Sequence, residues 1–311
     1  MTEHFVTLFN SKFLPQGLSL NSSMKEHILD YKLWVICLDM NCYEILRQLN
    51  YEHINAVLLS DFETEELLSI KAKRTFTEYC WTLTPFSFKF VFSLNSDIKR
   101  LTYLDADMFF FDNPKKIYKE FEVSKKNVLI TPHNYSPFYD QSKTSGRFCV
   151  QFLIIERDSG EAVRLDWEKK CSDWCFNRFE DDKFGDQKYL DAWPTDFADK
   201  VHVLVNREYL LAPWNILNYS IDQTVLFHFH GTRILNRNKV YIGNYLTPQS
   251  VYTYLYKPYL QNLHQSMDVL KKIGFTDVCQ RKNKLSLKIT SLLSLPYFII
   301  NLLKHKHIIK I

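Results

Sequence analysis

Glycine is scarce in this sequence, and its cysteines follow no pattern. Only 7 of the 311 residues are glycine, which excludes collagen-like chains and argues against linker-rich or disordered ones. The 7 cysteines are scattered and odd in number, so we expect reduced cytosolic thiols rather than a disulfide framework. We also expect no signal peptide, since an apolar strand pattern begins at Phe5. The longest apolar stretch, residues 289–303, is too short and interrupted to predict a transmembrane helix.

Acidic residues are absent from the C-terminal segment 281–311. Its basic side chains are Arg281, Lys282, Lys284, Lys288, Lys304, Lys306 and Lys310. The rest of the chain holds slightly more Asp and Glu than Lys and Arg, although the formal net charge of the whole chain is +4. A body that binds nucleic acid would be basic over its folded face, so we predict no nucleic-acid partner. The pattern indicates a basic tail on an enzyme-like body.

Short continuous apolar runs alternate with helical patterns along the body. We predict strands over residues 5–9, 33–38, 56–59, 100–104, 128–130, 150–155, 201–204 and 225–230. We predict helices over 12–27, 40–49, 63–94 with a break near Pro85, 117–121 and 161–179. This alternation is typical of an α/β protein with a mostly parallel sheet covered by helices on both faces. No composition break divides the body, so we expect one domain over 1–260 and a helical, basic appendage over 261–311.

Two aspartates, Asp105 and Asp107, end the predicted strand 100–104. Positions i and i+2 of a strand point to the same side, so the two carboxylates converge beyond its carboxyl end. Ligands bind at such ends in open α/β sheets. Carboxylates enter apolar surroundings when they are paired or bound to a metal, and we therefore predict a divalent cation with a phosphorylated ligand. The alternative is a strand end with two solvated aspartates.

A pair of histidines, His228 and His230, lies in the apolar run 225–230. Alternation places both imidazoles on one side of that strand. A nitrogen ligand added to two carboxylates favours Mn²⁺ over Mg²⁺. Taken alone, such a pair more often packs in a core or on a surface, and its role as a ligand depends on the partner that the acidic pair needs.

Two further polar groups are candidates for ligand binding. Asp186 and Gln187 open a predicted helix, where Asp186 is either an ordinary helix cap or, with Gln187, offers hydrogen bonds to sugar hydroxyls. Lys71 and Arg74 lie in a predicted helix, where they either neutralise a diphosphate or form a solvated face.

The order of these motifs resembles the retaining glycosyltransferases of the family 8 type, which include lipooligosaccharide galactosyltransferases and glycogenin. The resemblance rests on a strand-end Asp-x-Asp, a Gly-Asp-Gln before a helix and a later His-x-x-Gly, and it covers residues 1–245. It implies a GT-A fold, a nucleotide-diphosphate sugar as donor, Mn²⁺ or Mg²⁺ as cofactor, and retention of configuration at the transferred sugar.

The resemblance also implies a role for each residue that matches a motif. Asp105, Asp107 and His228 match the metal ligands of the family. Asp186 and Gln187 match its Asp-Gln pair beside the transferred sugar.

This chain departs from the family at two of the donor-binding positions. Gln151 stands where the family has a donor-binding Asn. Where the family follows His-x-x-Gly with Lys-Pro-Trp, Arg233 is the candidate to replace the lysine that holds the diphosphate. Phe9 and Asn10 end the N-terminal strand, which by the same resemblance meets the nucleotide.

The tail combines apolar residues with a polar stripe on one face of a predicted helix, followed by a basic cluster at 304–307. Such a segment lies in the interface of an anionic membrane; the alternative is a helix that closes the core. We therefore predict a peripheral enzyme at the cytoplasmic face of the cell membrane. Its acceptor would be a cell-surface glycan or a lipid-linked molecule such as lipid A-core.

Two other function classes stay open at this stage. A HAD-type phosphatase would use Asp105 as its nucleophile, although that class places the motif near the N-terminus with a Thr or Val after it. A non-catalytic module would bind a sugar nucleotide or a glycan in a similar pocket but would not transfer the sugar.

Overall fold

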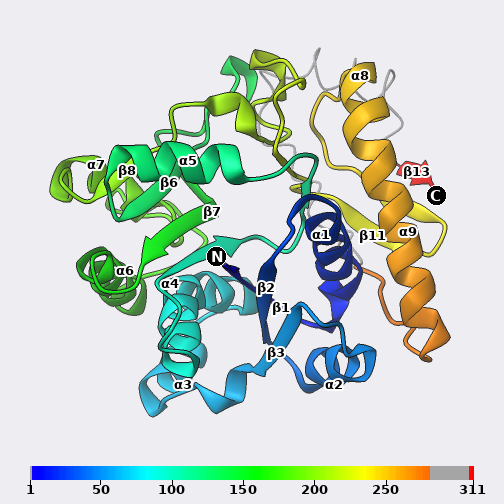
Figure 1. Ribbon diagram of the computed structural model, residues 1–311, viewed down its shortest axis with the longest axis horizontal. Helices are drawn as coiled ribbons and strands as arrows, with labels where there is room; N and C mark the ends of the chain where they lie inside the picture. The colour runs from blue at the N-terminus through cyan, green and yellow to red at the C-terminus, as the bar shows by residue number, and fades with distance from the viewer. Residues whose placement is uncertain (1, 281–307) are drawn as a thin grey trace.

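The computed structural model of the protein describes residues 2–280 and 308–311 (Figure 1). Its central feature is a seven-stranded sheet in the order β3-β2-β1-β4-β7-β6-β8. The strands are β1 (Glu3–Phe9), β2 (Tyr31–Cys37), β3 (Ile54–Leu58), β4 (Arg100–Leu104), β6 (Val128–Pro132), β7 (Phe148–Glu156) and β8 (Val201–Val203). The first four strands are parallel, and β7 runs antiparallel to both β4 and β6. The predicted α/β class with a mostly parallel sheet is confirmed.

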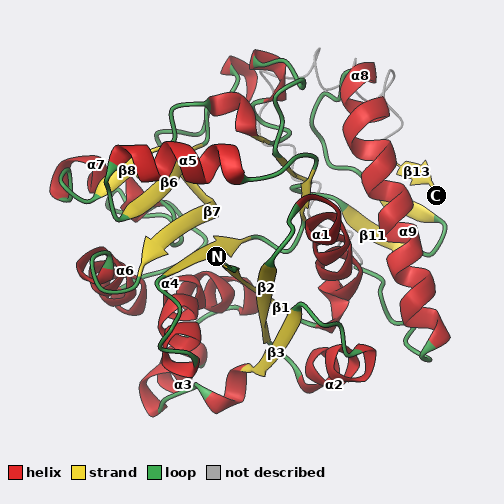
Figure 2. Ribbon diagram, in the orientation of Figure 1, coloured by secondary structure: helices red, strands yellow, loops and turns green. Residues whose placement is uncertain are grey.

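Helices cover both faces of this sheet (Figure 2). They are α1 (Leu14–His27), α2 (Met40–Leu49), α3 (Glu65–Lys71), α4 (Phe76–Leu94), α5 (Lys115–Ser124), α6 (Glu161–Asp173), α7 (Trp193–Asp196), α8 (Gln249–Val251) and α9 (Lys257–Lys272). Neighbouring residues of a strand face opposite sides. Phe5 of β1 therefore packs in the core under α1 and α9, and Val6 packs in the core with α4 and α6. Because both faces are buried, the strands read as continuous apolar runs.

Two small sheets flank the central one. The first has the order β5-β10-β9, with β5 (Met108–Phe110), β9 (Leu210–Leu211) and β10 (Leu226–His228). The second has the order β11-β12-β13, with β11 (Arg233–Asn236), β12 (Lys239–Tyr241) and β13 (Ile308–Lys310). In the first sheet β10 is antiparallel to β5 and pairs His228 with Met108. This register brings His228 next to the turn that follows β4.

Helix α4 runs through Pro85, so the predicted break near that residue is wrong. The break lies between α3 and α4 instead, where Thr75 and Glu78 form a capping box: the Thr75 amide donates to the Glu78 carboxylate at 2.8 Å. A proline inside a helix costs about 3 kcal/mol. The buried side chains of Leu83 and Phe88 on the same helix offset that cost by packing in the core.

Two other helices are shorter than predicted. Helix α6 ends at Asp173 rather than near residue 179. The helix that Asp186 and Gln187 were expected to open is a 3-10 turn (Lys188–Ala192) followed by the single turn of α7.

Helix α9 crosses residue 260, where we expected the body to end and an appendage to begin. Its residues Leu263, Met267 and Leu270 are buried in the core that also holds α1, and Figure 1 shows the two helices side by side. The last residues of the expected helical tail form strand β13, which pairs with β12, so the prediction of a helix is wrong there. Most of the tail, residues 281–307, lies outside the described residues. Among those described, no helix is long and apolar enough to cross a bilayer.

The contact between α1 and the end of β1 gives a test of the packing. A methyl group added at Gly17 would overlap the buried ring of Phe9. Overpacking of this kind costs about 1–3 kcal/mol, which exceeds the gain of up to about 1 kcal/mol from replacing glycine by alanine in a helix. We therefore expect Gly17→Ala to lower the free energy of unfolding in urea, whereas Lys25→Ala on the exposed face of α1 should change it little. An unfolding free energy that rises in Gly17→Ala would contradict this packing.

Candidate metal centre

The turn between β4 and β5 carries Asp105 and Asp107. The amide of Asp105 donates to the carbonyl of Gln151 on the neighbouring strand β7 at 3.2 Å, and the amide of Met108 donates back to the carbonyl of Asp105 at 3.2 Å. The Tyr103 hydroxyl donates to Asp105 Oδ1 at 3.0 Å. Main-chain and side-chain bonds therefore fix the direction of the Asp105 carboxylate at the carboxyl end of β4.

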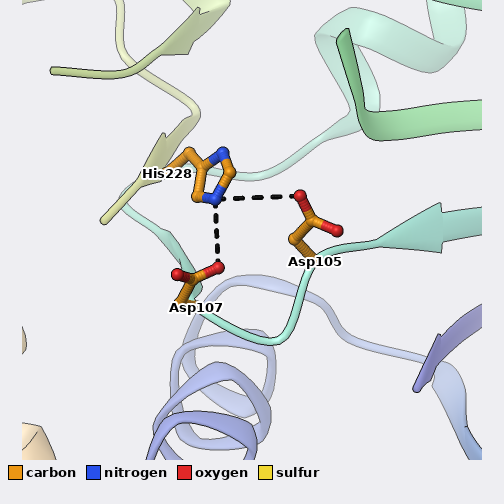
Figure 3. A group of neighbouring side chains, drawn as sticks. All are labelled: Asp105, Asp107 and His228. Atoms are coloured by element: carbon orange, nitrogen blue, oxygen red, sulfur yellow. Dashed lines mark hydrogen bonds and ion pairs between the residues drawn. The ribbon is translucent and has the colours of Figure 1, made fainter. Parts of the chain in front are cut away.

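His228 approaches this turn from β10 (Figure 3). Its Nε2 lies 3.0 Å from Asp107 Oδ1 and 3.7 Å from Asp105 Oδ2. The amide of Phe229 donates to the carbonyl of Asp107 at 2.9 Å and ties the two segments together. One ligand atom from each of Asp105, Asp107 and His228 lies within 4.8 Å of the others. The predicted cluster of three residues is thus brought together.

Burial and mutual attraction set the protonation of the cluster. Burial opposes ionisation of Asp107, but the charge of His228 and its hydrogen bond outweigh burial and lower the pKa of Asp107 well below its usual range. Burial raises the pKa of Asp105, with the charge of Asp107 adding to it and His228 opposing it. Burial lowers the pKa of His228, but the Asp107 carboxylate overcomes this and the net shift is upward. The upward shift in the pKa of His228 favours the protonated imidazole beside the two carboxylates.

The donor set fits a divalent cation. Asp107 and His228 are 8% and 4% exposed and Asp105 is half-buried, so the two carboxylates lie where like charges repel more strongly than in water. A cation between them removes that repulsion. Two carboxylate oxygens and one imidazole nitrogen form a mixed set that suits Mn²⁺ and tolerates Mg²⁺.

Gln151 lies against the cluster from β7. It is 1% exposed, and its Oε1 lies 2.8 Å from His228 Nδ1. The other end of the amide, Nε2, is buried and has no hydrogen-bond partner among the described residues. The residue that we predicted to bind the donor therefore contacts a metal-ligand candidate and keeps one free hydrogen-bond donor.

Asp186 lies close enough to Asp105 for the two carboxyl groups to interact electrostatically. It follows Gly185, whose positive φ of +53° and close approach to the ring of Trp81 leave little room for a side chain there. Burial raises the pKa of Asp186 to about 7, and the charge of Asp105 contributes to the rise. Gln187 is half-buried and its Nε2 donates to a main-chain carbonyl at 2.8 Å. Asp186, 5% exposed, is thus a buried acid near the cluster.

Arg233 acts on the cluster through its charge and lies near the residues that follow β1. The positive charge of Arg233 contributes to lowering the pKa of Asp107, and its guanidinium lies 5.5 Å from the ring centre of Phe13. Phe13 closes the 3-10 turn that follows Asn10. Asn10 Oδ1 is buried without a hydrogen-bond partner among the described residues, and Phe9 is buried beside it. The predicted nucleotide and diphosphate residues are therefore grouped around Phe13.

Lys71 and Arg74 are not brought to this group. The guanidinium of Arg74 donates to the carbonyls of Cys171 and Ser172 at the end of α6, at 2.7 and 2.8 Å. Lys71 Nζ pairs with a Glu63 carboxylate oxygen at 2.8 Å. No hydrogen bond or ion pair of the described residues links either side chain to the Asp-Asp-His cluster. These contacts favour structural roles for both.

The sequence analysis missed Tyr103 and Trp214. Tyr103 stands two positions before Asp105 on one strand, so the alternation that paired the two aspartates also predicts a tyrosine on their side. The ring of Trp214 meets the imidazole of His228 edge-on, with ring centres 5.4 Å apart, and lies 5.3 Å from His230. No local sequence signal marks Trp214, because it reaches the site through a loop. His230 itself is exposed and is not part of the cluster.

Sequence comparison finds relatives of this chain in Bacillus subtilis (strain 168). The chain is 31% identical to the uncharacterized protein YfnD of Bacillus subtilis (strain 168) over 291 residues, which is 87% of this chain and 91% of YfnD. The chain belongs to the family of YfnD. It is also 26% identical over 258 residues to the uncharacterized protein YfnF of the same organism, covering 77% of this chain and 85% of YfnF. No family model matches the sequence.

Solved structures of low sequence identity share the fold. The glycosyltransferase GlyE of Streptococcus pneumoniae TIGR4 superposes with a TM-score of 0.53 at 12% identity, covering 91% of this chain and 66% of that one. The bifunctional glycosyltransferase WbbM gives a TM-score of 0.53 at 11% identity, covering 87% of this chain and 51% of that one. The fold is that of the GT-A type, as the sequence resemblance implied.

A buried histidine behind the centre gives a test of the electrostatics. His133 is 3% exposed, stacks on Tyr135 with ring centres 4.5 Å apart, and burial lowers its pKa to about 3. Below pH 6.5 the unfolded chain protonates this residue and the folded chain does not, so the free energy of unfolding falls by about 1.4 kcal/mol for each pH unit lost.

We expect His133→Phe to remove that contribution. Urea unfolding at pH 6.5, 5.5 and 4.5 should show the stability of the variant rising relative to that of the wild type as the pH falls. Parallel stability curves for the two proteins would contradict a neutral buried His133.

Proposed function

We propose that this protein is a metal-dependent glycosyltransferase that moves a sugar from a nucleotide-diphosphate sugar to a glycan or lipid-linked acceptor, with retention of configuration. One observation carries the proposal: two carboxylates and an imidazole converge at the carboxyl end of the parallel strands in a fold of the GT-A type. Ligands bind at that edge in open α/β sheets. A diphosphate is the ligand that a cation at such a site suits best.

Each side of the site suits one part of such a donor. Asp105, Asp107 and His228 would hold Mn²⁺, which when bound stabilises the negative charge that develops on the leaving diphosphate. Arg233 would add a positive charge near Asp107 and stabilise the same negative charge on the oxygens of the leaving diphosphate. The family resemblance and this placement support Arg233 as the replacement for the missing lysine.

The sugar and the base would lie on opposite sides of the cluster. Asp186 and Gln187 would face the transferred sugar, whose oxocarbenium-like transition state a buried carboxylate stabilises. Gln151 offers its free Nε2 to an oxygen of the donor. The buried Oδ1 of Asn10, next to Phe9, has no hydrogen-bond partner in the described part of the chain and would accept from the nucleoside.

The central test is Mn²⁺-dependent release of nucleoside diphosphate from a panel of nucleotide sugars. We expect Asp107→Ala to reduce the rate at least about 100-fold, because the variant loses charge stabilisation worth several kcal/mol. Asp97→Ala, which removes an exposed aspartate elsewhere, is the matched control and should keep the rate.

Each rival class predicts another outcome of the same assay. A HAD-type phosphatase with Asp105 as nucleophile would release inorganic phosphate from phosphate esters. A non-catalytic module would bind a nucleotide sugar and leave it intact. An Asp107→Ala variant as active as the wild type would also contradict the proposal.

We further infer that segment 281–307 attaches the enzyme to the inner face of the cell membrane. Its sequence is apolar and basic, which suits an anionic lipid surface. The chain leaves the described body at Gln280, whose amide donates to the carbonyl of Ile234 on β11, and returns at Ile308 on β13, which pairs with β12 of the same small sheet. Both ends of the segment are therefore held on the small sheet that carries Arg233, and an acceptor in the membrane would stay near the site.

Vesicle sedimentation tests this attachment. Each basic residue near an anionic surface contributes about 1 kcal/mol, so Lys304→Gln with Lys306→Gln should weaken binding to phosphatidylglycerol vesicles roughly 30-fold. Replacing 281–307 by a Gly-Ser linker, which keeps β13, should abolish the binding. Equal binding of the wild type to vesicles of phosphatidylcholine alone would contradict an electrostatic attachment.

A further inference from the structure

Gln151 contacts two of the three candidate metal ligands. Its carbonyl accepts the amide of Asp105 at 3.2 Å within the ladder between β4 and β7. Its side-chain Oε1 lies 2.8 Å from Nδ1 of His228. One residue of β7 therefore joins the β4 turn to β10. We propose that Gln151 is the positioning residue of the metal centre, a role that rests on the proposed function.

The contact at Nδ1 decides which nitrogen of His228 is free for a cation. A neutral imidazole carries its proton on one nitrogen and a lone pair on the other. Oε1 of Gln151 is an acceptor, so it holds the proton on Nδ1 and leaves the lone pair on Nε2. Nε2 is the atom that faces Asp107 at 3.0 Å and Asp105 at 3.7 Å. With a donor in place of Oε1, the proton would move to Nε2, and the cation would lose a ligand.

Two hydrogen bonds fix the rotation of this imidazole among the described residues: one joins Nε2 to Asp107 at 3.0 Å and the other joins Nδ1 to Gln151 at 2.8 Å. Trp214 meets the ring edge-on, at an angle of 86° between the planes, and makes no hydrogen bond to it. The strand pairing of β10 fixes the main chain of His228 but leaves its side-chain torsions free. A ring that turned about its bonds would carry Nε2 away from the aspartates. With a cation at Nε2 in place of the bond to Asp107, the hydrogen bond from Nδ1 to Gln151 is the one that still opposes this rotation.

Side-chain length explains why a glutamine stands at this position. An asparagine on the same main chain would be shorter by one carbon–carbon bond of about 1.5 Å. Its oxygen would then stop beyond hydrogen-bond distance of Nδ1, which requires about 3.2 Å or less. Glutamine in place of the asparagine of the family 8 type enzymes, which this sequence resembles, thus gives His228 its orienting partner.

Titration of the full-length protein with Mn²⁺ alone, followed by calorimetry, tests this role without any turnover. Loss of the partner that orients a ligating histidine typically weakens metal binding about 10–100-fold. We expect Gln151→Leu, which keeps the size and removes the acceptor, to weaken Mn²⁺ binding by that factor. We expect Gln151→Glu, which can only accept at Nδ1, to bind Mn²⁺ at least as tightly as the wild type. Gln151→Asn should resemble the leucine variant.

The controls separate failure of this inference from failure of the proposed function. Gln16→Leu replaces a buried amide of α1 that bonds to Gln280 and, among the described residues, to none of the three ligand candidates, and it should keep the affinity for Mn²⁺. Thermal unfolding of each variant checks that it is folded. If the wild type binds Mn²⁺ and Gln151→Leu binds it equally well, the positioning role is wrong. The positioning role is also wrong if Gln151→Glu binds Mn²⁺ as weakly as Gln151→Leu. In that case an acceptor at this position does not restore the affinity, and the loss is purely structural. If the wild type itself does not bind Mn²⁺, the proposed metal-dependent function is wrong, and the positioning role falls with it.

Discussion

The meeting of two carboxylates at one strand end is the constraint on which the rest of the site depends. Asp105 and Asp107 stand at the carboxyl end of β4, and because Asp107 is buried at 8% exposure, their like charges repel more strongly than in solvent. Such a pair is stable only with a positive charge beside it. His228 supplies that charge when it is protonated, and a divalent cation supplies it when bound. A proton on His228 and a divalent cation would therefore be alternative sources of positive charge at one place.

The topology of the strands brings the positive partner to this place. The central sheet changes from parallel to antiparallel pairing at β7, so the early part of β7 lies beside the end of β4 and puts Gln151 next to Asp105. The strand β5, which continues from the aspartates, pairs with β10 and puts His228 next to Asp107. Neither contact is local in sequence. The centre is assembled from three segments, at residues 105–107, 151 and 228, that only the folded sheet brings together.

These features explain what the sequence could and could not predict. Continuous apolar runs predict the buried strands well, because both faces of the sheet are covered. The spacing of Asp105 and Asp107 predicts their convergence, because strand periodicity is local. Arg74 was expected at a diphosphate, but its partners are carbonyls at the end of α6, nearly a hundred residues away, and no local pattern reports them. The start of α4 was readable from the capping box at Thr75 and Glu78, a stronger signal than the proline at which we placed the break.

The electrostatic asymmetry of the centre supports a donor with two unlike ends. The charge of Arg233 acts on Asp107 and His228, whereas the charge of Asp105 acts on Asp186. One side of the centre is therefore biased toward anionic oxygens, and the other holds a buried acid whose ionisation is disfavoured. A nucleotide-diphosphate sugar has the matching order, with a diphosphate that needs positive charge and a sugar that turns cationic only as its bond to that diphosphate breaks. Under the proposed function, a ligand that set its phosphates against Arg233 would bring its sugar toward Asp186, so the two aspartates proposed to hold the cation would also fix the direction in which the donor binds.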